Sequence, residues 1–273
     1  MGRKLTGAMA EQRTEPAAGE AILQVRGLTK RLGAVEALRD VTFTVHEGES
    51  FVIMGPSGAG KSVLLKHLVG LLRPDAGEIV LWGLPVHDAD EATWDRLRTR
   101  IGVVFQSAAL FDSLTVGENV AFPLRRHRRL PEAEVRRIVA AKLRLVDLEG
   151  VEDRFPAELS GGMRKRVGIA RALALDPELI LYDEPTGGLD PLTARAVDAL
   201  IARLRAQLAV TSVIVTHDLE TAFGVGDRLA LLWEGRLVAV GPPQAVAADP
   251  RPEVQSFLGS RPQVTRPAAV GPR

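Results

Sequence analysis

The chain has 273 residues, of which 46% are hydrophobic and 25% are charged. This is the composition of an ordinary globular protein, so extensive disorder is excluded, and the length allows one large domain or a domain with an insertion. The 35 basic and 34 acidic residues give a formal net charge of +1, so no overall field favours nucleic acid or anionic lipid. The lack of cysteine excludes disulfides and thiolate chemistry.

The apolar runs of the sequence are too short for a membrane-spanning helix. The runs at 51–54 and 180–182 have the length of strands, whereas a spanning helix requires about 20 apolar residues. Residues 1–20 lack the apolar core of a signal peptide, and residues 261–273 are rich in proline and arginine. We therefore expect flexible tails at both ends and a folded domain over 21–260.

The first half of the chain begins with strand patterns. Alternating stretches at 22–27 and 41–45 predict antiparallel edge strands. The run at 50–54 is apolar throughout and ends at glycine, as expected for a strand buried on both faces, and helical spacing follows over 61–72. Strand signals then fade, and an apolar stripe at helical spacing predicts a helical subdomain inserted at about 107–178.

Strands and helices alternate again in the second half. Strand patterns at 179–183, 212–216 and 228–233 are separated by helical patterns at 193–207 and 218–225. Such alternation is typical of a mostly parallel sheet. The sequence therefore predicts an α/β fold of the P-loop (RecA-like) type, with a mostly parallel core sheet, an N-terminal antiparallel β subdomain and an inserted helical subdomain.

A glycine-rich loop joins the strand at 50–54 to the helix at 61–72, and it fits the pattern G-x-x-x-x-G-K-[ST]. Glycines allow backbone N–H groups to close around phosphate oxygens, and the helix N-terminus adds about half a positive charge. Lys61 is expected to reach the β- and γ-phosphates and the Ser62 hydroxyl to bind Mg²⁺, unless the loop is only a turn. The candidate nucleotide-binding residues here are Gly55, Pro56, Ser57, Gly58, Ala59, Gly60, Lys61, Ser62 and Val63, the last through its backbone N–H.

Two later strands end in polar residues. The strand at 179–183 ends in Asp183 and is followed by Glu184, and the carboxyl ends of parallel strands line the ligand crevice. Asp183 is placed to orient Mg²⁺ or its water, and Glu184 to polarise an attacking water as general base. His217 follows the strand at 212–216 at the same edge. The simpler interpretation is a turn for the acidic pair and a structural role for the histidine.

Residues 159–166 read Leu-Ser-Gly-Gly-Met-Arg-Lys-Arg, which places a capping serine and two glycines at the start of a helix. This is a second anion-binding terminus, and one nucleotide does not need two. If each terminus is half of a composite site, two copies pair about a twofold axis, and Ser160, Gly161 and Gly162 of one copy cover the γ-phosphate held by the other. ATP would then join the copies, and hydrolysis would loosen them.

Over about 22–259 the chain resembles the ATP-binding-cassette (ABC) family. The motifs that carry the resemblance are the glycine-rich loop, Gln106, Leu159 to Gly162, Asp183 with Glu184, Leu189 with Asp190, and His217. The resemblance implies an ATPase that uses ATP and Mg²⁺, in which Gln106 links Mg²⁺ and the attacking water to the helical subdomain and His217 contacts the γ-phosphate. It also implies that Asp190 lies in the loop crossing the dimer interface. Leu32 stands where many cassettes place an aromatic residue, so it would contact adenine without ring stacking.

Four segments, 60–67, 105–116, 117–124 and 160–166, resemble the cassette subunits of the Mla, or MCE-associated, lipid-trafficking systems. That resemblance implies permease subunits and an MCE-domain substrate-binding protein as partners. It also implies phospholipid movement between inner and outer membranes and a place on the cytoplasmic face of the inner membrane. The apolar residues of 107–124 are expected to form the groove that receives a permease helix, or else only to pack the subdomain.

Other functions stay open. The chain could be an importer cassette for another lipid or for a small polar solute. A nucleic-acid-linked ABC ATPase would share the catalytic residues, but such proteins carry two cassettes in one chain, long coiled coils or zinc insertions, so no nucleic-acid partner is expected. A stand-alone P-loop kinase or GTPase would lack the motif at 159–162.

Overall fold

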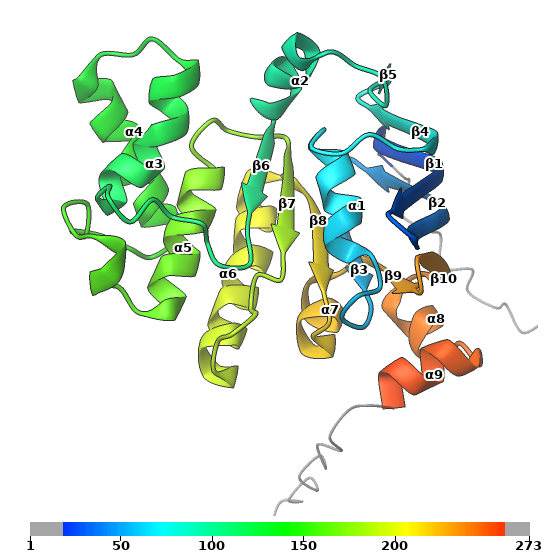
Figure 1. Cartoon of the computed structure of the whole chain (residues 1–273). Coiled ribbons are helices and arrows are strands. Elements are labelled where there is room, and N and C mark those ends of the chain that lie inside the picture. The colour runs from blue at the N-terminus through cyan, green and yellow to red at the C-terminus, as the bar shows by residue number, and fades with distance from the viewer. Residues whose placement is uncertain (1–18, 260–273) are drawn as a thin grey trace, which may run out of the picture.

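The computed structural model describes residues 19–259, which form two sheets and the helices around them (Figure 1). The tails expected over 1–20 and 261–273 lie outside the described residues, apart from residues 19 and 20. In chain order the strands are β1 (Ala21–Leu32), β2 (Val35–His46), β3 (Ser50–Met54), β4 (Ala76–Leu81), β5 (Leu84–Pro85), β6 (Ile101–Val104), β7 (Leu179–Asp183), β8 (Thr211–Thr216), β9 (Arg228–Trp233) and β10 (Arg236–Gly241). The helices are α1 (Lys61–Leu68), α2 (Glu91–Arg98), α3 (Val116–His127), α4 (Glu132–Leu145), α5 (Gly161–Ala172), α6 (Pro191–Leu208), α7 (Leu219–Val225), α8 (Pro243–Ala247) and α9 (Pro252–Gly259), with a 3₁₀ helix η1 (Pro156–Glu158).

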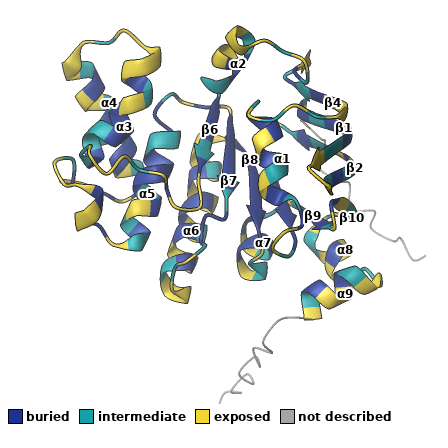
Figure 2. Cartoon of the chain, in the orientation of Figure 1, coloured by how far each residue is buried: buried dark blue, intermediate teal, exposed yellow. Residues whose placement is uncertain are grey.

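The larger sheet forms the centre of the molecule, and its strand order is β10-β9-β3-β8-β7-β6. All of its neighbouring strands are parallel except β10, which pairs antiparallel with β9. The residues of β3 alternate between two cores: Val52 and Met54 face α3 to α7, whereas Phe51 and Ile53 face α1 and the smaller sheet. Burial on both faces explains why this strand is apolar from Phe51 to Met54, and Figure 2 shows the buried residues concentrated along the sheet.

The smaller sheet has the order β2-β1-β4-β5 and is antiparallel throughout. This agrees with the predicted antiparallel N-terminal subdomain. The prediction of an edge strand at 22–27 is wrong, because β1 lies between β2 and β4. The alternation of buried residues in β1 could not reveal its central position. Side chains point out of the sheet, so their pattern does not depend on whether one or both edges of the strand are paired.

Helices α3, α4 and α5 pack together at the end of the molecule farthest from the smaller sheet (Figure 1). The second half of the stretch 107–124 belongs to helix α3, although Pro123 lies inside it. Thr115 and Glu118 form a capping box that fixes the start of α3, and this Thr-x-x-Glu signal was available in the sequence. None of the helices in residues 19–259 is both long and apolar enough to cross a bilayer.

The helix after the glycine-rich loop is shorter than predicted. Helical spacing suggested 61–72, but α1 ends at Leu68 because Gly70 has a φ of 71° and turns the chain. A Cβ at Gly70 would lie 2.3 Å from the ring of Trp94, so this position requires glycine.

Candidate active site

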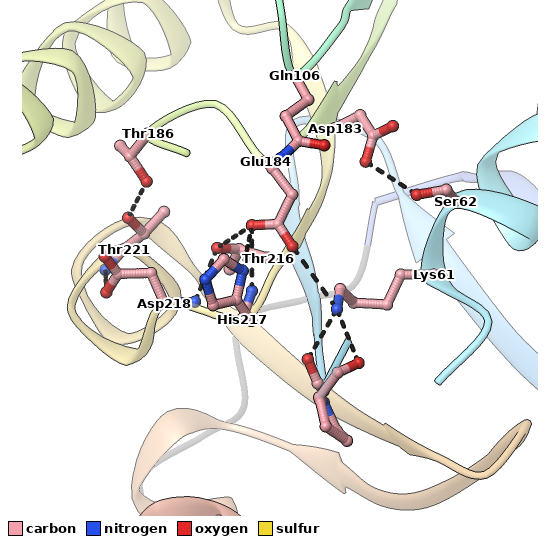
Figure 3. A network of polar contacts seen from close by, with 12 residues as sticks. Lys61, Ser62, Gln106, Asp183, Glu184, Thr186, Thr216, His217, Asp218 and Thr221 are labelled. Atoms are coloured by element: carbon pink, nitrogen blue, oxygen red, sulfur yellow. Dashed lines mark hydrogen bonds and ion pairs between the residues drawn. The ribbon is translucent and has the colours of Figure 1, made fainter. Parts of the chain in front are cut away.

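Four neighbouring parallel strands end at one edge of the larger sheet, in the order β3-β8-β7-β6. The register aligns their ends, with pairs Met54–Thr216, Asp183–Val215 and Tyr182–Val104. The chain leaves these ends through the glycine-rich loop, His217, Glu184 and Gln106. Figure 3 shows that side chains from all four strand ends converge. This edge is where parallel α/β sheets bind ligands.

The glycine-rich loop passes into α1 through a backbone that only glycine adopts easily. Gly60 is the N-cap of α1 with a φ of 107°, and a Cβ there would lie 2.5 Å from the carbonyl oxygen of Ala37. Neither a capping side chain nor an acidic residue occupies the first turn of α1. The backbone N–H groups of that turn are therefore available to an anion, and the positive end of the helix favours it.

Lys61 is only 7% exposed, and it lies between the loop and Glu184. Its Nζ donates hydrogen bonds to the carbonyls of Gly55 at 2.7 Å and Pro56 at 3.1 Å, and it lies 3.6 Å from Glu184 Oε1. Burial lowers the pKa of Lys61, and the negative charges of Glu184 and Asp183 oppose that shift. The ammonium is thus within reach of both the loop and the carboxylates.

Ser62 and Asp183 bring two oxygen atoms together. Ser62 Oγ donates a hydrogen bond to Asp183 Oδ1 at 3.3 Å. Burial raises the pKa of Asp183, and the hydrogen bond from Ser62 opposes this shift. A nearby cation would also lower the pKa and favour the ionised carboxylate. Within residues 19–259 no cluster of three or more His, Cys, Asp or Glu side chains could hold a metal. The oxygen pair fits Mg²⁺, which binds one or two protein oxygens and completes its shell with phosphates and water.

Glu184 follows β7 directly and is 8% exposed. Its Oε2 lies 2.9 Å from His217 Nδ1 and accepts hydrogen bonds at 3.2 Å from the backbone N–H of His217 and from Thr216 Oγ1. A carboxylate only accepts, so His217 Nδ1 carries the proton of this contact. Glu184 has a φ of 48°, which costs a residue other than glycine about 1–3 kcal/mol. The surrounding bonds hold the carboxylate in one orientation, as a general base requires.

Gln106 lies just beyond β6, and its side chain extends toward Asp183 and Glu184 (Figure 3). The loop after β7 passes close to it, because a Cβ at Gly187 would lie 3.5 Å from Gln106 Nε2. The predicted residues Lys61, Ser62, Asp183, Glu184, His217 and Gln106 therefore gather in one place.

The predicted signature residues Ser160, Gly161 and Gly162 lie elsewhere. Ser160 caps α5 by accepting a hydrogen bond from the N–H of Met163 at 3.3 Å. A Cβ at Gly162 would lie 2.5 Å from Thr193 Cγ2, so the segment packs on the start of α6. Among the described residues no hydrogen bond or ion pair joins these three residues to Lys61, Glu184 or His217.

Three other predicted nucleotide-contacting residues have distinct surroundings. Asp190 is the N-cap of α6 and accepts hydrogen bonds from the N–H groups of Leu192 and Thr193. Leu32 lies at the end of β1 and is 45% exposed, which leaves apolar surface for a contact. Val63 is partly buried and packs against the core shared by α1 and the smaller sheet.

The segment 107–124 contributes to an apolar groove beside α5. Phe111 and Phe122 are 43% and 45% exposed, and their ring centroids lie 4.8 Å apart. Val116 and Val120 are instead buried in the core. Some residues of the segment therefore pack the subdomain, and others line an exposed groove. The groove is lined by Arg98, Ile101, Gly102, Val103, Phe105, Ala109, Phe111, Phe122, Pro123, His127, Arg171, Ala172 and Leu175.

Two polar groups near the site, the buried Lys165 and the partly buried Asp198, were missed in the sequence. Lys165 donates to the carbonyls of Gln106 and Glu184, but its basic neighbours made it look like part of a solvated helix face. Asp198 in α6 accepts from Thr221 Oγ1 at 3.0 Å, and Thr221 Oγ1 lies 3.0 Å from Thr186 Oγ1. This chain of contacts links α6, α7 and the loop after Glu184. A single acidic residue within an amphipathic helix gives no sequence signal of such a role.

Asp198 should make stability depend on pH. Burial raises its pKa from 3.8 to about 6, Thr221 opposes the shift, and Asp218 and Glu220 add to it. Because its pKa is higher in the folded state, Asp198 binds its proton more tightly there, which stabilises the fold at low pH. This contribution to the free energy of unfolding is complete below about pH 4 and is lost as the pH rises through about 6. Asp198→Asn should therefore raise the free energy of unfolding by about 1–2 kcal/mol at pH 8 and by much less at pH 4.5. The value at pH 8 is smaller than the whole pKa shift would give, because Asp198 is partly exposed. Urea denaturation at both pH values checks this; an equal difference at both would contradict it.

Comparison with known proteins agrees with the fold and identifies the family. A family model described as ABC transporter matches residues 38–187. The chain is 46% identical over 239 residues to the probable ribonucleotide transport ATP-binding protein mkl of Mycobacterium tuberculosis, covering 88% of this chain and 67% of that protein. It is 46% identical over 241 residues to the sulfate/thiosulfate import ATP-binding protein CysA of Bordetella parapertussis, covering 87% of this chain and 67% of that protein.

Among solved structures, the dimeric post-hydrolysis state of the ATP-binding cassette MJ0796 bound to ADP and Pi is similar with a TM-score of 0.74. The two chains are 35% identical, and the match covers 81% of this chain and 98% of that one. The sequence, the fold and the convergent site thus give one answer: the chain belongs to the ABC transporter family and is an ATP-hydrolysing cassette that uses ATP with Mg²⁺.

Proposed function

We propose that this chain is the motor subunit of a membrane transporter and that two copies enclose ATP between them. The observation that carries the proposal is the separation of two anion-binding helix termini. The terminus of α1 lies beside Lys61, Glu184 and His217, whereas the terminus of α5, capped by Ser160, packs on α6. A second copy, turned about a twofold axis, would supply the missing terminus to each nucleotide. The similar cassette MJ0796 is described as dimeric.

Within one copy, the roles follow from the contacts. The loop N–H groups and Lys61 would bind the phosphates. Ser62, Asp183 and Gln106 would hold Mg²⁺, which neutralises charge on the phosphate oxygens. Glu184 would accept the proton of the attacking water, and His217, fixed through Nδ1, would contact the γ-phosphate through its other ring nitrogen.

The apolar groove beside α5 is the surface we assign to the permease. Phe105, Phe111 and Phe122 are each more than 40% exposed on or beside it, and exposed apolar groups that cluster usually mark a contact. A helix of a membrane partner would bury these rings. Bound to such a partner, the chain would lie on the cytoplasmic face of the inner membrane.

For the cargo, we propose phospholipid trafficking between inner and outer membranes, with an MCE-domain protein as a further subunit. The support is the resemblance of segments 60–67, 105–116, 117–124 and 160–166 to Mla-type cassettes. A second candidate, import of a small polar solute, is favoured by the names of similar proteins, which include ribonucleotide and sulfate/thiosulfate transport. The groove and the ATPase site serve either cargo equally.

The general-base role predicts the behaviour of Glu184→Gln. The amide keeps the shape of the side chain but cannot take a proton, so turnover should fall at least a hundredfold while ATP affinity stays within about threefold. Steady-state phosphate release and nucleotide binding measure the two quantities. Turnover within tenfold of the wild type would remove Glu184 as the base.

The composite site predicts complementation between two inactive variants. Lys61→Ala should bind ATP poorly, and Ser160→Arg should bind ATP but obstruct the partner's nucleotide. A mixed pair retains one complete site, made from the loop of the Ser160→Arg copy and the α5 terminus of the Lys61→Ala copy. Mixing the two should restore hydrolysis well above either alone. If the mixture is as inactive as its components, or if Ser160→Arg alone is active, the shared-site model fails.

The cargo proposals differ in what purifies with the chain. Affinity purification of the tagged chain from detergent-solubilised membranes should recover a permease and an MCE-domain protein, and phospholipid should stimulate hydrolysis by that complex. Recovery of a permease with a soluble solute-binding protein, and stimulation by the solute, would favour the second candidate. Recovery of ribosomes or DNA in place of a permease would overturn the transport assignment.

A further inference from the structure

One side of α5 faces the segment that begins at Gln106. The residues on it are spaced by three: Lys165, Gly168 and Arg171. Arg171 donates to the carbonyls of Ala108 and Ala109, both at 2.7 Å. A Cβ on Gly168 would lie 3.3 Å from the Cβ of Ala108, so the two segments pack closely at this glycine.

Lys165 makes the contact nearest the reacting groups. Its Nζ donates to the carbonyl of Gln106 at 2.6 Å and to the carbonyl of Glu184 at 3.0 Å. The residue is 5% exposed. Burial lowers the pKa of Lys165, and the negative charges of Glu184 and Asp183 oppose that shift. An ammonium in such a place is retained only where its hydrogen bonds and nearby charges offset the loss of water.

The backbone that Lys165 and Arg171 hold is strained. Ala108 and Ala109 have φ values of 62° and 46°, and Glu184 has a φ of 48°. Residues other than glycine keep such angles only where neighbouring groups impose them. The buried Lys165 and the half-buried Arg171, which donate to the carbonyls of Glu184, Ala108 and Ala109, supply that constraint.

We propose that Lys165 is a positioning residue for ATP hydrolysis. It holds the backbones of Gln106 and Glu184 on α5, and it thereby fixes the distance between the metal-facing amide of Gln106 and the water-polarising carboxylate of Glu184. The inference rests on the roles given to Gln106 and Glu184 under the proposed function. Lys165 itself contacts neither substrate nor metal. Removing its ammonium should therefore change the rate of the chemical step and leave ATP binding intact.

The first test is Lys165→Met, which keeps an unbranched stem of similar length without the charge. We expect the kcat for ATP hydrolysis to fall at least tenfold while the KM and the ATP dissociation constant stay within about threefold. Lys142→Met is the matched control, because Lys142 is 8% exposed and pairs with Asp176 in the helical subdomain, away from the site. It should lower the melting temperature without lowering kcat.

A second test restores the ammonium chemically. The chain has no cysteine, so Lys165→Cys carries a single thiol. The variant is alkylated in denaturant in two separate reactions. 2-Bromoethylamine recreates a side chain of lysine length that ends in an ammonium, whereas iodoacetamide adds a neutral group. Both products are refolded in parallel with unmodified wild type. The aminoethylated protein should recover at least a third of the refolded wild-type kcat, and the carbamidomethylated protein should stay at the level of Lys165→Met.

The two tests separate this inference from the proposed function. If Lys165→Met keeps a kcat within twofold of wild type, or if both alkylated proteins have the same kcat, Lys165 does not position the site. If Glu184→Gln also retains turnover, both the general-base assignment and the inference about Lys165 fail. Loss of turnover in Glu184→Gln together with normal turnover in Lys165→Met would contradict only the inference about Lys165 and would leave the proposed function intact.

Discussion

The structure depends on the alignment of four parallel strands whose carboxyl ends meet at one edge. The register between β3, β8, β7 and β6 is continuous, so a slip of one residue in any strand would turn its terminal side chain to the opposite face. Burial on both sides prevents such slips, because the interior residues of β3, β7 and β8 are almost entirely apolar. The core thus determines where Glu184, His217 and Gln106 lie before any of them contacts a nucleotide.

Charge balance is the second constraint at this edge. Two lysines, Lys61 and Lys165, lie in the field of two carboxylates, Asp183 and Glu184. Asp183 is partly buried, and the other three side chains are buried. Each lysine donates to backbone carbonyls while its charge is offset by the acids. The lysines thus offset the charge of the carboxylates, whereas hydrogen bonds from Thr216, His217 and Ser62 orient the carboxylates.

The sequence predicted those features that local chemistry determines. The buried strand before Gly55, the phosphate-binding pattern and the acidic pair after β7 follow from short patterns, and the strand at 228–233 coincides with β9. It could not predict the place of β1 between β2 and β4, the helix that continues through Pro123, or the contacts of Lys165 and Asp198. These depend on segments far apart in the chain: Lys165 meets a carbonyl 59 residues away, and Thr221 meets a carboxylate 23 residues away. Residue type alone carries no information about such partners.

Helix α5 connects the parts of this cassette that must act together. Its first turn carries the Ser160 cap, which we assign to the partner's nucleotide; its middle holds Gln106 and Glu184 through Lys165; and Arg171 at its far end lines the apolar groove. A helix of 12 residues is stiff over this length, so displacement of either end shifts the carbonyls bound to it. If a partner in the groove favours the arrangement that hydrolyses ATP, then ATP must favour occupation of the groove by the same free energy.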